Sequence, residues 1–144
     1  MMLQDILRAK GAEVFCIASS ANLEDVVQML VARNCGSLVV ADANAGGPLA
    51  GIITERDILR TTAATKQPLR EIPVVEAMTR HVITASPHDS VEAVMGVLTE
   101  HRIRHLPVVE HDELVGMISI GDLVKAQVEE LAMENHFLKN YIQG

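Results

Sequence analysis

The chain has 144 residues, of which 49% are hydrophobic, and it carries a formal net charge of −7. This length and composition are sufficient for one compact globular domain with its own hydrophobic core. The acidic balance, the lack of a basic run and an aromatic content of 2% argue against polymeric nucleic acid as a partner, because DNA and RNA are bound by clustered cations and stacking rings.

No apolar run approaches the ~20 residues that span a membrane, and the first residues lack the basic and apolar stretches of a signal peptide. We therefore expect a cytoplasmic protein without a membrane partner. The two cysteines, Cys16 and Cys35, form no C-x-x-C pattern and stand in apolar surroundings. We interpret them as small buried side chains and expect no metal site.

Hydrophobic spacing and turn residues in the first half predict a short helix, a strand, a longer helix, two strands and another helix. In chain order, these elements are expected at residues 3–10, 14–17, 23–33, 37–41, 50–53 and 55–62. Gly11 is expected to stop the first helix in a left-handed conformation, and Asn22 to cap the second helix. The strand at 37–41 is apolar, which predicts burial on both faces. Residues 43–48 contain two glycines and a proline, which is typical of a loop.

The second half is predicted to follow the same order of elements. They are expected as strands at 82–84, 106–109 and 114–118, a turn at 110–113, and helices at 90–101 and from 122 onward. Residues 65–73 are polar and contain two prolines, which indicates a linker. We therefore divide one compact module into a first repeat (7–64), the linker (65–73), a second repeat (74–125) and a C-terminal helical extension (126–144).

The two halves are copies of one unit. Val14 aligns with Val82, and Leu38 aligns with Leu106 at the same spacing. Gly51 aligns with Gly116 at a spacing three residues shorter, and the difference falls in the predicted loop, where insertions are tolerated. The predicted fold is therefore α/β (α+β), with two β-α-β-β-α repeats in a pseudo-twofold arrangement. Each repeat alone would have a marginal core.

The last helix is predicted to be about 22 residues long, or roughly 33 Å, which is longer than a small domain needs. It carries a heptad seam with one polar member, formed by Val124, Val128, Leu131, Asn135, Leu138 and Ile142. Such a seam is typical of a coiled coil, and an Asn within it favours a dimer of fixed register. We expect a homodimer. The alternative is an amphipathic helix that packs back on its own module.

Two motifs of a hydroxyl and a carboxylate open helices at equivalent positions. They are Thr54-x-x-Asp57 and Ser119-x-x-Asp122, and each follows a glycine and two apolar residues. One interpretation is helix capping, in which the hydroxyl accepts from a first-turn N–H group. The other is a nucleotide site, because free N–H groups at a helix start bind phosphate and the carboxylate can accept from ribose hydroxyls. The two interpretations are compatible.

Cations near these motifs differ between the repeats. Arg104 and His105 stand where a helix gives way to a buried strand, and both can approach a phosphate. The first repeat has Gly36 and Ser37 there, whereas Arg56 in its first helical turn has a glycine counterpart in the second repeat. The two sites are therefore expected to be unequal. The alternative for Arg104 and His105 is a solvated cluster at a helix end.

No catalytic motif accompanies these residues. The sequence contains no nucleophile elbow, no zinc-protease motif and no P-loop. We therefore expect no catalytic residues and no enzyme.

Together, these motifs resemble a known family. Residues 51–57, 77–79, 104–109 and 116–122 are similar in sequence and order to the motifs of a tandem pair of cystathionine β-synthase (CBS) domains, the Bateman module. The resemblance extends over roughly residues 7–125. Stand-alone bacterial proteins with two CBS domains and a long C-terminal helix have the same overall pattern.

The resemblance implies an adenine ligand bound between the repeats, with AMP as the first expectation, then NAD(H) or ATP, and with S-adenosylmethionine as a further option. In this family pattern Asp57 and Asp122 hold ribose hydroxyls. The expected nucleotide-binding residues are Ile17, Ala18, Gly36, Ser37, Thr54, Arg56, Asp57, Thr84, Arg104, His105, Pro107, Ser119 and Asp122. The Gly36–Ser37 pair departs from the pattern because it lacks the basic residues.

The expected function is regulatory. Binding of an adenine nucleotide would shift a dimer between states and so change its affinity for a separate effector protein. The alternative is a structural or interaction module that uses the same fold without a ligand.

Overall fold

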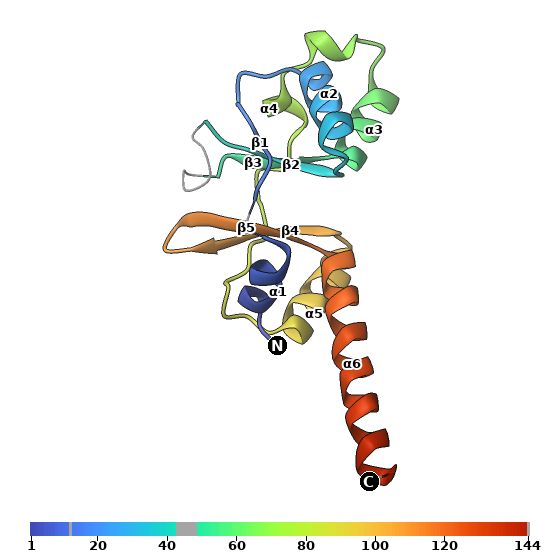
Figure 1. Cartoon of the computed structure of the whole chain (residues 1–144). Coiled ribbons are helices and arrows are strands. Elements are labelled where there is room, and N and C mark those ends of the chain that lie inside the picture. Colours follow the sequence, from blue (N-terminus) through green and yellow to red (C-terminus); the bar gives the residue numbers. More distant parts are fainter. Residues whose placement is uncertain (12, 43–48, 144) are drawn as a thin grey trace.

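The computed structural model describes residues 1–11, 13–42 and 49–143. Two small sheets lie one above the other in the middle of the molecule, with helices on the outer face of each (Figure 1). Helices α2 (Leu23–Arg33), α3 (Glu55–Ala64) and α4 (Val74–Ala77) cover one sheet, whereas α1 (Leu3–Lys10) and α5 (Val91–His101) cover the other. This mixed α/β arrangement confirms the predicted fold class.

The first half follows the predicted order of elements. They are α1 (Leu3–Lys10), β1 (Cys16–Ile17), α2 (Leu23–Arg33), β2 (Ser37–Val40), β3 (Gly51–Thr54) and α3 (Glu55–Ala64). Strand β2 is central, since it pairs with β1 in parallel and with β3 antiparallel. All four of its residues are buried, as its apolar sequence predicts. The loop predicted at 43–48 lies outside the described residues.

Two local predictions concern helix ends. Gly11 ends α1 with a positive φ of 92°, and its N–H group donates to the carbonyl oxygen of Leu7 at 2.9 Å, but its ψ of 156° lies outside the left-handed helical region that was predicted. Asn22 caps α2, because its side-chain oxygen accepts from the N–H group of Asp25 at 2.9 Å. The cap at Asn22 is therefore confirmed, whereas Gly11 ends its helix at the predicted position in a different conformation.

The second half departs from the prediction at three points. Its elements are η1 (Leu69–Glu71, a 3-10 helix), α4 (Val74–Ala77), α5 (Val91–His101), β4 (His105–Glu110), β5 (Glu113–Ser119) and α6 (Ile120–Gln143). The predicted linker thus contains a helical turn, which Pro68 immediately precedes, and α4 forms after Pro73 where no helix was predicted. Residues 82–84 form no strand.

Only one residue takes over the role of the missing strand. Ala85 forms an isolated parallel bridge with Val108, and its N–H group donates to the carbonyl oxygen of Pro107 at 3.0 Å. Strands β4 and β5 form a hairpin whose turn residues His111 and Asp112 have positive φ values of 52° and 63°. Two such residues in succession match the twist of a tight hairpin.

The two hydrophobic cores exchange their covering helices. Leu3 and Leu7 of α1 are buried in the core of the second half, together with Val91, Leu98 and Leu123. In the other direction, the end of the linker and the start of α4 pack on the first half. Their buried residues there are Ile72 and Val74. The core of the second half therefore includes residues from the first helix of the chain, whereas the core of the first half is completed by residues from its middle.

A third, smaller apolar cluster joins the two sheets. It contains Val39 and Ala41 from the first half and Leu114 from β5, all of them buried. Met117 and Cys16 pack against the same cluster. The halves are thus in direct apolar contact. Met117 of this cluster also lines the cavity between the halves.

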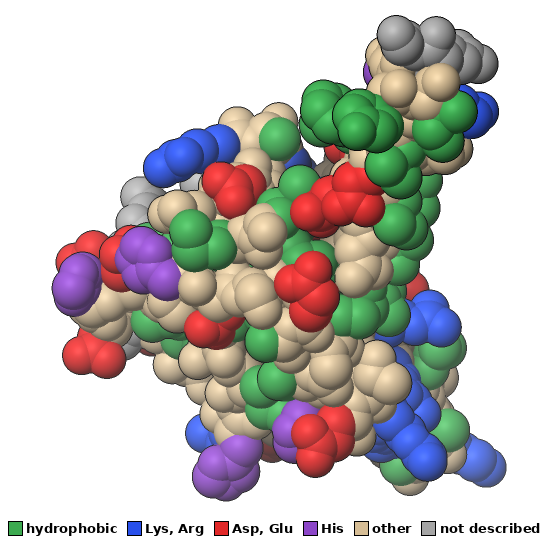
Figure 2. Space-filling model, turned by 90° about the horizontal axis from the view of Figure 1, so that it is seen from below, with side chains coloured by type: hydrophobic (Ala, Val, Ile, Leu, Met, Phe, Trp, Pro, Cys, Tyr) green, Lys and Arg blue, Asp and Glu red, His purple; other side chains and the backbone are tan. Residues whose placement is uncertain are grey.

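Helix α6 leaves the body of the protein after its second turn. Leu123 and Ala126 are buried, but every residue from Leu131 to Ile142 is exposed. Figure 1 shows the helix projecting away from both sheets. The alternative in which this helix packs back on its own module is therefore wrong. Figure 2 shows hydrophobic side chains gathered along the projecting part.

In the described ranges, no helix combines the length and apolar character needed to cross a membrane.

Candidate ligand-binding site

A cavity of about 360 Å³ opens between the two halves. Its size lies within the range of small-molecule sites in proteins. The first half contributes the segments that lead into β1 and β2, and the second half contributes β5 and the starts of β4 and α6. The lining residues are Lys10, Gly11, Glu13, Val14, Phe15, Cys35, Gly36, Ser37, His105, Met117, Ser119 and Asp122.

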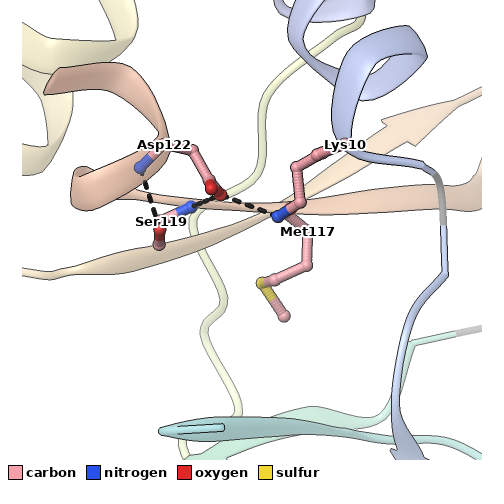
Figure 3. Close-up of polar contacts among 4 residues, drawn as sticks. All are labelled: Lys10, Met117, Ser119 and Asp122. Carbon is pink, nitrogen blue, oxygen red and sulfur yellow. Dashed lines mark hydrogen bonds and ion pairs between the residues drawn. The ribbon is translucent and has the colours of Figure 1, made fainter. Parts of the chain in front are cut away.

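Ser119 and Asp122 stand where β5 passes into α6. The hydroxyl oxygen of Ser119 accepts from the N–H group of Asp122 at 3.1 Å. In return, Oδ2 of Asp122 accepts from the N–H group of Ser119 at 2.9 Å. This reciprocal pair is a capping box, which holds both side chains at the helix start and directs them to the cavity (Figure 3).

Lys10, the last residue of α1, reaches the same carboxylate from the opposite side. Its Nζ atom lies 2.7 Å from Oδ2 of Asp122 and 3.0 Å from the carbonyl oxygen of Met117 (Figure 3). Burial acts to raise the pKa of Asp122. The hydrogen bonds from Lys10 and Ser119 and the positive charge of Lys10 outweigh this effect and hold the pKa below its ordinary value. Asp122 is therefore ionised and paired in this structure at neutral pH.

His105 begins β4 at the wall of the cavity. Burial lowers the pKa of its imidazole below the ordinary value, and nearby Lys10 and Arg104 act in the same direction. Glu55 and Asp122 oppose this shift without outweighing it. The ring is therefore neutral at pH 7, so one of its nitrogens can donate a hydrogen bond and the other can accept one.

The equivalent motif of the first half is more enclosed and lies outside this cavity. Asp57 is only 7% exposed. Its Oδ2 atom accepts from the N–H group of Thr54 at 3.0 Å and from the Thr54 hydroxyl at 3.1 Å. The nearest cation is Arg60, whose guanidinium nitrogen is 4.0 Å from Oδ1. Both halves therefore show the capping contacts, but only the second directs its pair into the cavity.

The structure brings some predicted nucleotide-binding residues together and separates others. Those that line the cavity are Gly36, Ser37, His105, Ser119 and Asp122. Ile17 and Ala18 instead line a second depression of about 680 Å³ beside α2. The predicted residues that line neither space are Thr54, Arg56, Asp57, Thr84, Arg104 and Pro107. The roles of all of these residues in binding stay predictions.

Sequence reasoning missed several lining residues. Lys10 is the most important of these, because it contacts Asp122 directly. The comparison of the two copies contains a signal for Lys10. The spacing that aligns Val14 with Val82 also aligns Lys10 with Met78, so one copy carries a charge where the other has an uncharged side chain. Phe15 was assigned only to a strand, yet it lines the cavity, with the Arg33 guanidinium 5.0 Å from its ring centre.

Metal coordination has no support in the part of the chain that the structure describes. No group of three or more His, Cys, Asp and Glu side chains there could hold a metal ion. Cys16 and Cys35 are both half-buried and form no disulfide with each other.

Comparison with known proteins identifies the family to which this chain is similar. The model of the CBS domain matches twice, at residues 3–63 and 69–129. The chain is similar to the mitochondrial CBS domain-containing protein CBSX3 of Arabidopsis thaliana, with 36% identity over 99% of this chain and 72% of that protein.

Solved structures agree. ATU1752 from Agrobacterium tumefaciens, a CBS-domain containing protein, is 33% identical over 88% of this chain and 99% of its own, with a TM-score of 0.83. The CBS domain pair of protein MJ0100, in complex with 5′-methylthioadenosine and S-adenosyl-L-methionine, is 26% identical. It covers 90% of this chain and 98% of its own, with a TM-score of 0.78. The chain belongs to the CBS-domain family and is a tandem pair of these domains.

Proposed function

We propose that this protein is a regulatory module that binds an adenine nucleotide and acts through a separate effector protein. The observation that carries this proposal is the cavity between the two halves, which unites Ser119 and Asp122 with the strand entries at Ser37 and His105. A hydroxyl, a carboxylate and first-turn N–H groups at one helix start suit the sugar and phosphate of a nucleotide.

The cavity has suitable chemistry for each part of such a ligand. Oδ1 of Asp122 accepts no hydrogen bond from the described residues, so it is available to a ribose hydroxyl. Val14, Phe15 and Met117 supply apolar surface for a purine. AMP is the first candidate, followed by NAD(H) or ATP. The complex of the related MJ0100 domain pair with two adenosine compounds supports the ligand class and keeps S-adenosylmethionine as an option.

Self-association through α6 is the second part of the proposal. The exposed seam of the helix includes Leu131 and Leu138, which are 63% and 57% exposed in the single chain. In a parallel pair, Asn135 would face its own copy within the seam, and Glu134 would lie opposite Lys139 of the other chain. The apolar exposure and this charge pattern support a parallel homodimer. The ligand-binding helix start and the dimer seam would then belong to the same helix.

A ligand-free interaction module is the competing function. The observation that favours it is the Lys10–Asp122 ion pair, which neutralises the carboxylate through Oδ2 without any ligand. In this case the hydroxyl–carboxylate pairs would only cap helices. Asp122→Asn would then cost about 1 kcal/mol of stability and change no response to nucleotides.

A thermal-shift panel on protein stripped of ligand separates the two functions. The panel contains AMP, ADP, ATP, NAD, NADH and S-adenosylmethionine. A ligand at 100 times its dissociation constant stabilises the native state by about 2.7 kcal/mol, which gives a clear rise in melting temperature. We expect one ligand class to shift the wild type and to lose its effect on Asp122→Asn.

Asp112→Asn is the matched control for this variant. It makes the same change of charge at an exposed turn residue whose φ of 63° asparagine tolerates. The control should respond like the wild type. A flat panel on folded, stripped wild-type protein would exclude the nucleotide-binding function and favour the interaction module.

A further inference from the structure

Lys10 is held at the cavity by the helix that it ends. Leu3 and Leu7 of α1 are buried in the core of the second half. The N–H group of Leu3 also donates to the carbonyl oxygen of Asp89 at 3.0 Å. The backbone that carries Lys10 is therefore fixed to the same half of the molecule as Asp122, and its ammonium group belongs to the cavity wall.

The two halves differ at this position. In the first half, Thr79 pairs with Ile52 of β3 through backbone hydrogen bonds of 3.0 and 2.9 Å. Met117 is the counterpart of Ile52 at the spacing of Gly51 and Gly116, and its carbonyl oxygen accepts from Nζ of Lys10 instead. The position of Lys10 is taken in the other copy by Met78, which has no charge. An ammonium group has thus replaced a backbone contact in one half.

Lys10 and a bound ribose draw on the same carboxylate. Oδ2 of Asp122 already accepts from Lys10 and from the Ser119 N–H group. A ribose diol that engages both carboxylate oxygens therefore competes with Lys10 for Oδ2. The Lys10 side chain is 36% exposed and also donates to the carbonyl oxygen of Met117, so an ammonium group displaced from Oδ2 stays at the cavity wall and is stabilised further by an anionic acceptor close by.

The substituent at the 5′ carbon of the ligand decides whether this acceptor exists. A 5′-phosphate supplies oxygen atoms and negative charge to the displaced ammonium group. A neutral thioether at the same carbon supplies neither, and a sulfonium adds a repelling positive charge. Among the residues that line the cavity, Lys10 is the single lysine or arginine in the part of the chain that the structure describes.

We propose that Lys10 is a specificity-determining residue, which selects adenosine ligands with an anionic 5′ group over those with a neutral or cationic one. This inference rests on the proposed function, because it concerns which member of the adenosine class the same cavity takes. It also implies that an equivalent cavity without the lysine prefers adenosine ligands with a neutral or cationic 5′ group.

AMP and 5′-methylthioadenosine are the matched probes for this proposal, because they differ only in the 5′ substituent. Isothermal titration calorimetry compares both on wild-type protein, Lys10→Met, Lys10→Arg and Arg8→Met. Lys10→Met introduces the residue found in the other copy. Arg8→Met removes the same charge from the same helix at a side chain that is 75% exposed.

We expect wild-type protein and Arg8→Met to bind AMP at least about tenfold more tightly than 5′-methylthioadenosine, the size of one charge-assisted hydrogen bond. Lys10→Met should lose most of this ratio, through weaker binding of AMP and tighter binding of 5′-methylthioadenosine. Lys10→Arg keeps the charge and should keep a preference for AMP. Binding heat that disappears in Asp122→Asn identifies the event as belonging to this cavity.

Two results overturn the inference and are distinguishable from each other. If Lys10→Met binds both probes with the wild-type ratio, the role of Lys10 is wrong and the proposed function still stands. If wild-type protein binds neither probe, nor any other adenine nucleotide, both the function and the role of Lys10 are wrong. Lys10→Gln, which keeps a hydrogen-bond donor without charge, replaces Lys10→Met if the methionine variant does not fold.

Discussion

Gly36 of the first half lies directly against His105 of the second. A Cβ atom at Gly36 would come within 3.4 Å of Cε1 and 3.6 Å of Nε2 of the imidazole. The sequence alignment treats the Gly36–Ser37 and Arg104–His105 strand entries as equivalent but separate. In the structure Gly36, Ser37 and His105 meet at one cavity, so the strand entries of the two copies form one shared wall.

The burial of His105 predicts a pH dependence of stability. Its pKa is lowered in the folded protein, so the unfolded chain takes up a proton first as the pH falls through about 6.5. Stability is therefore present above this pH and decreases below it. Urea denaturation of wild-type protein should show a steeper loss of unfolding free energy from pH 7.5 to 5.5 than His105→Gln. Equal slopes in the two proteins would contradict this prediction.

The Lys10–Asp122 pair predicts a second pH dependence of stability, in which the titrating group is the carboxylate of Asp122. The pKa of Asp122 is lowered, so its contribution to stability is fully present above about pH 4 and is lost as the pH falls further. Lys10→Met should reduce the unfolding free energy by about 0.5 to 1 kcal/mol at pH 7, since the pair is partly exposed. This difference should decrease as the pH falls below about 4, because protonation of Asp122 removes the ion pair. A difference that does not change with pH would assign the loss to packing of the lysine stem.

Gly51 and Gly116 occupy equivalent positions, but substitution by alanine is expected to reduce stability by unequal amounts at the two sites. A Cβ atom at Gly51 would lie 2.7 Å from the carbonyl oxygen of Thr79, which is fixed by a hydrogen bond from the Ile52 N–H group. At Gly116 the closest atom, at 2.6 Å, is Cδ2 at the flexible end of Leu7. We expect Gly51→Ala to cost about 3 kcal/mol and Gly116→Ala about 1 kcal/mol of stability in urea denaturation. The reverse order would be inconsistent with this packing.

The exposed seam of α6 predicts how the proposed dimer can be separated. Leu131→Asp combined with Leu138→Asp should give a monomer in sedimentation velocity at concentrations where the wild type is a dimer. The melting temperature of the monomeric module should be retained, because both side chains point to solvent within one chain. Met133→Asp is the control, since Met133 is 75% exposed but outside the seam. Dissociation by the control alone would place the contact on another face of the helix.

Local features of the fold were readable from the sequence. The cap at Asn22, the stop at Gly11 and the burial of β2 each depend on one residue type or one short pattern. The strand expected at 82–84 failed because strand propensity forms a strand only where a partner backbone is aligned, and here the pairing is limited to Ala85.

Contacts between distant segments were not readable in the same way. The capping motif at Ser119 and Asp122 is visible in the sequence, but its ion pair with Lys10 joins the end of the first helix to the start of the last. The sequence alignment of the copies also assigns α1 to the first half. Its buried contacts are with Val91, Leu98 and Leu123 of the second. Periodicity reports which face of a helix is buried, and it does not report against which partner.

The exchange of covering helices has a consequence for synthesis of the chain. A ribosome releases the amino end first. Leu3 and Leu7 therefore emerge well before Leu123, which shares their core. The first helix must wait, with its apolar face uncovered, until the start of α6 has been made. The core of the first half contains only residues up to Met78 and can form earlier, so loss of α1 would damage the half that is translated later.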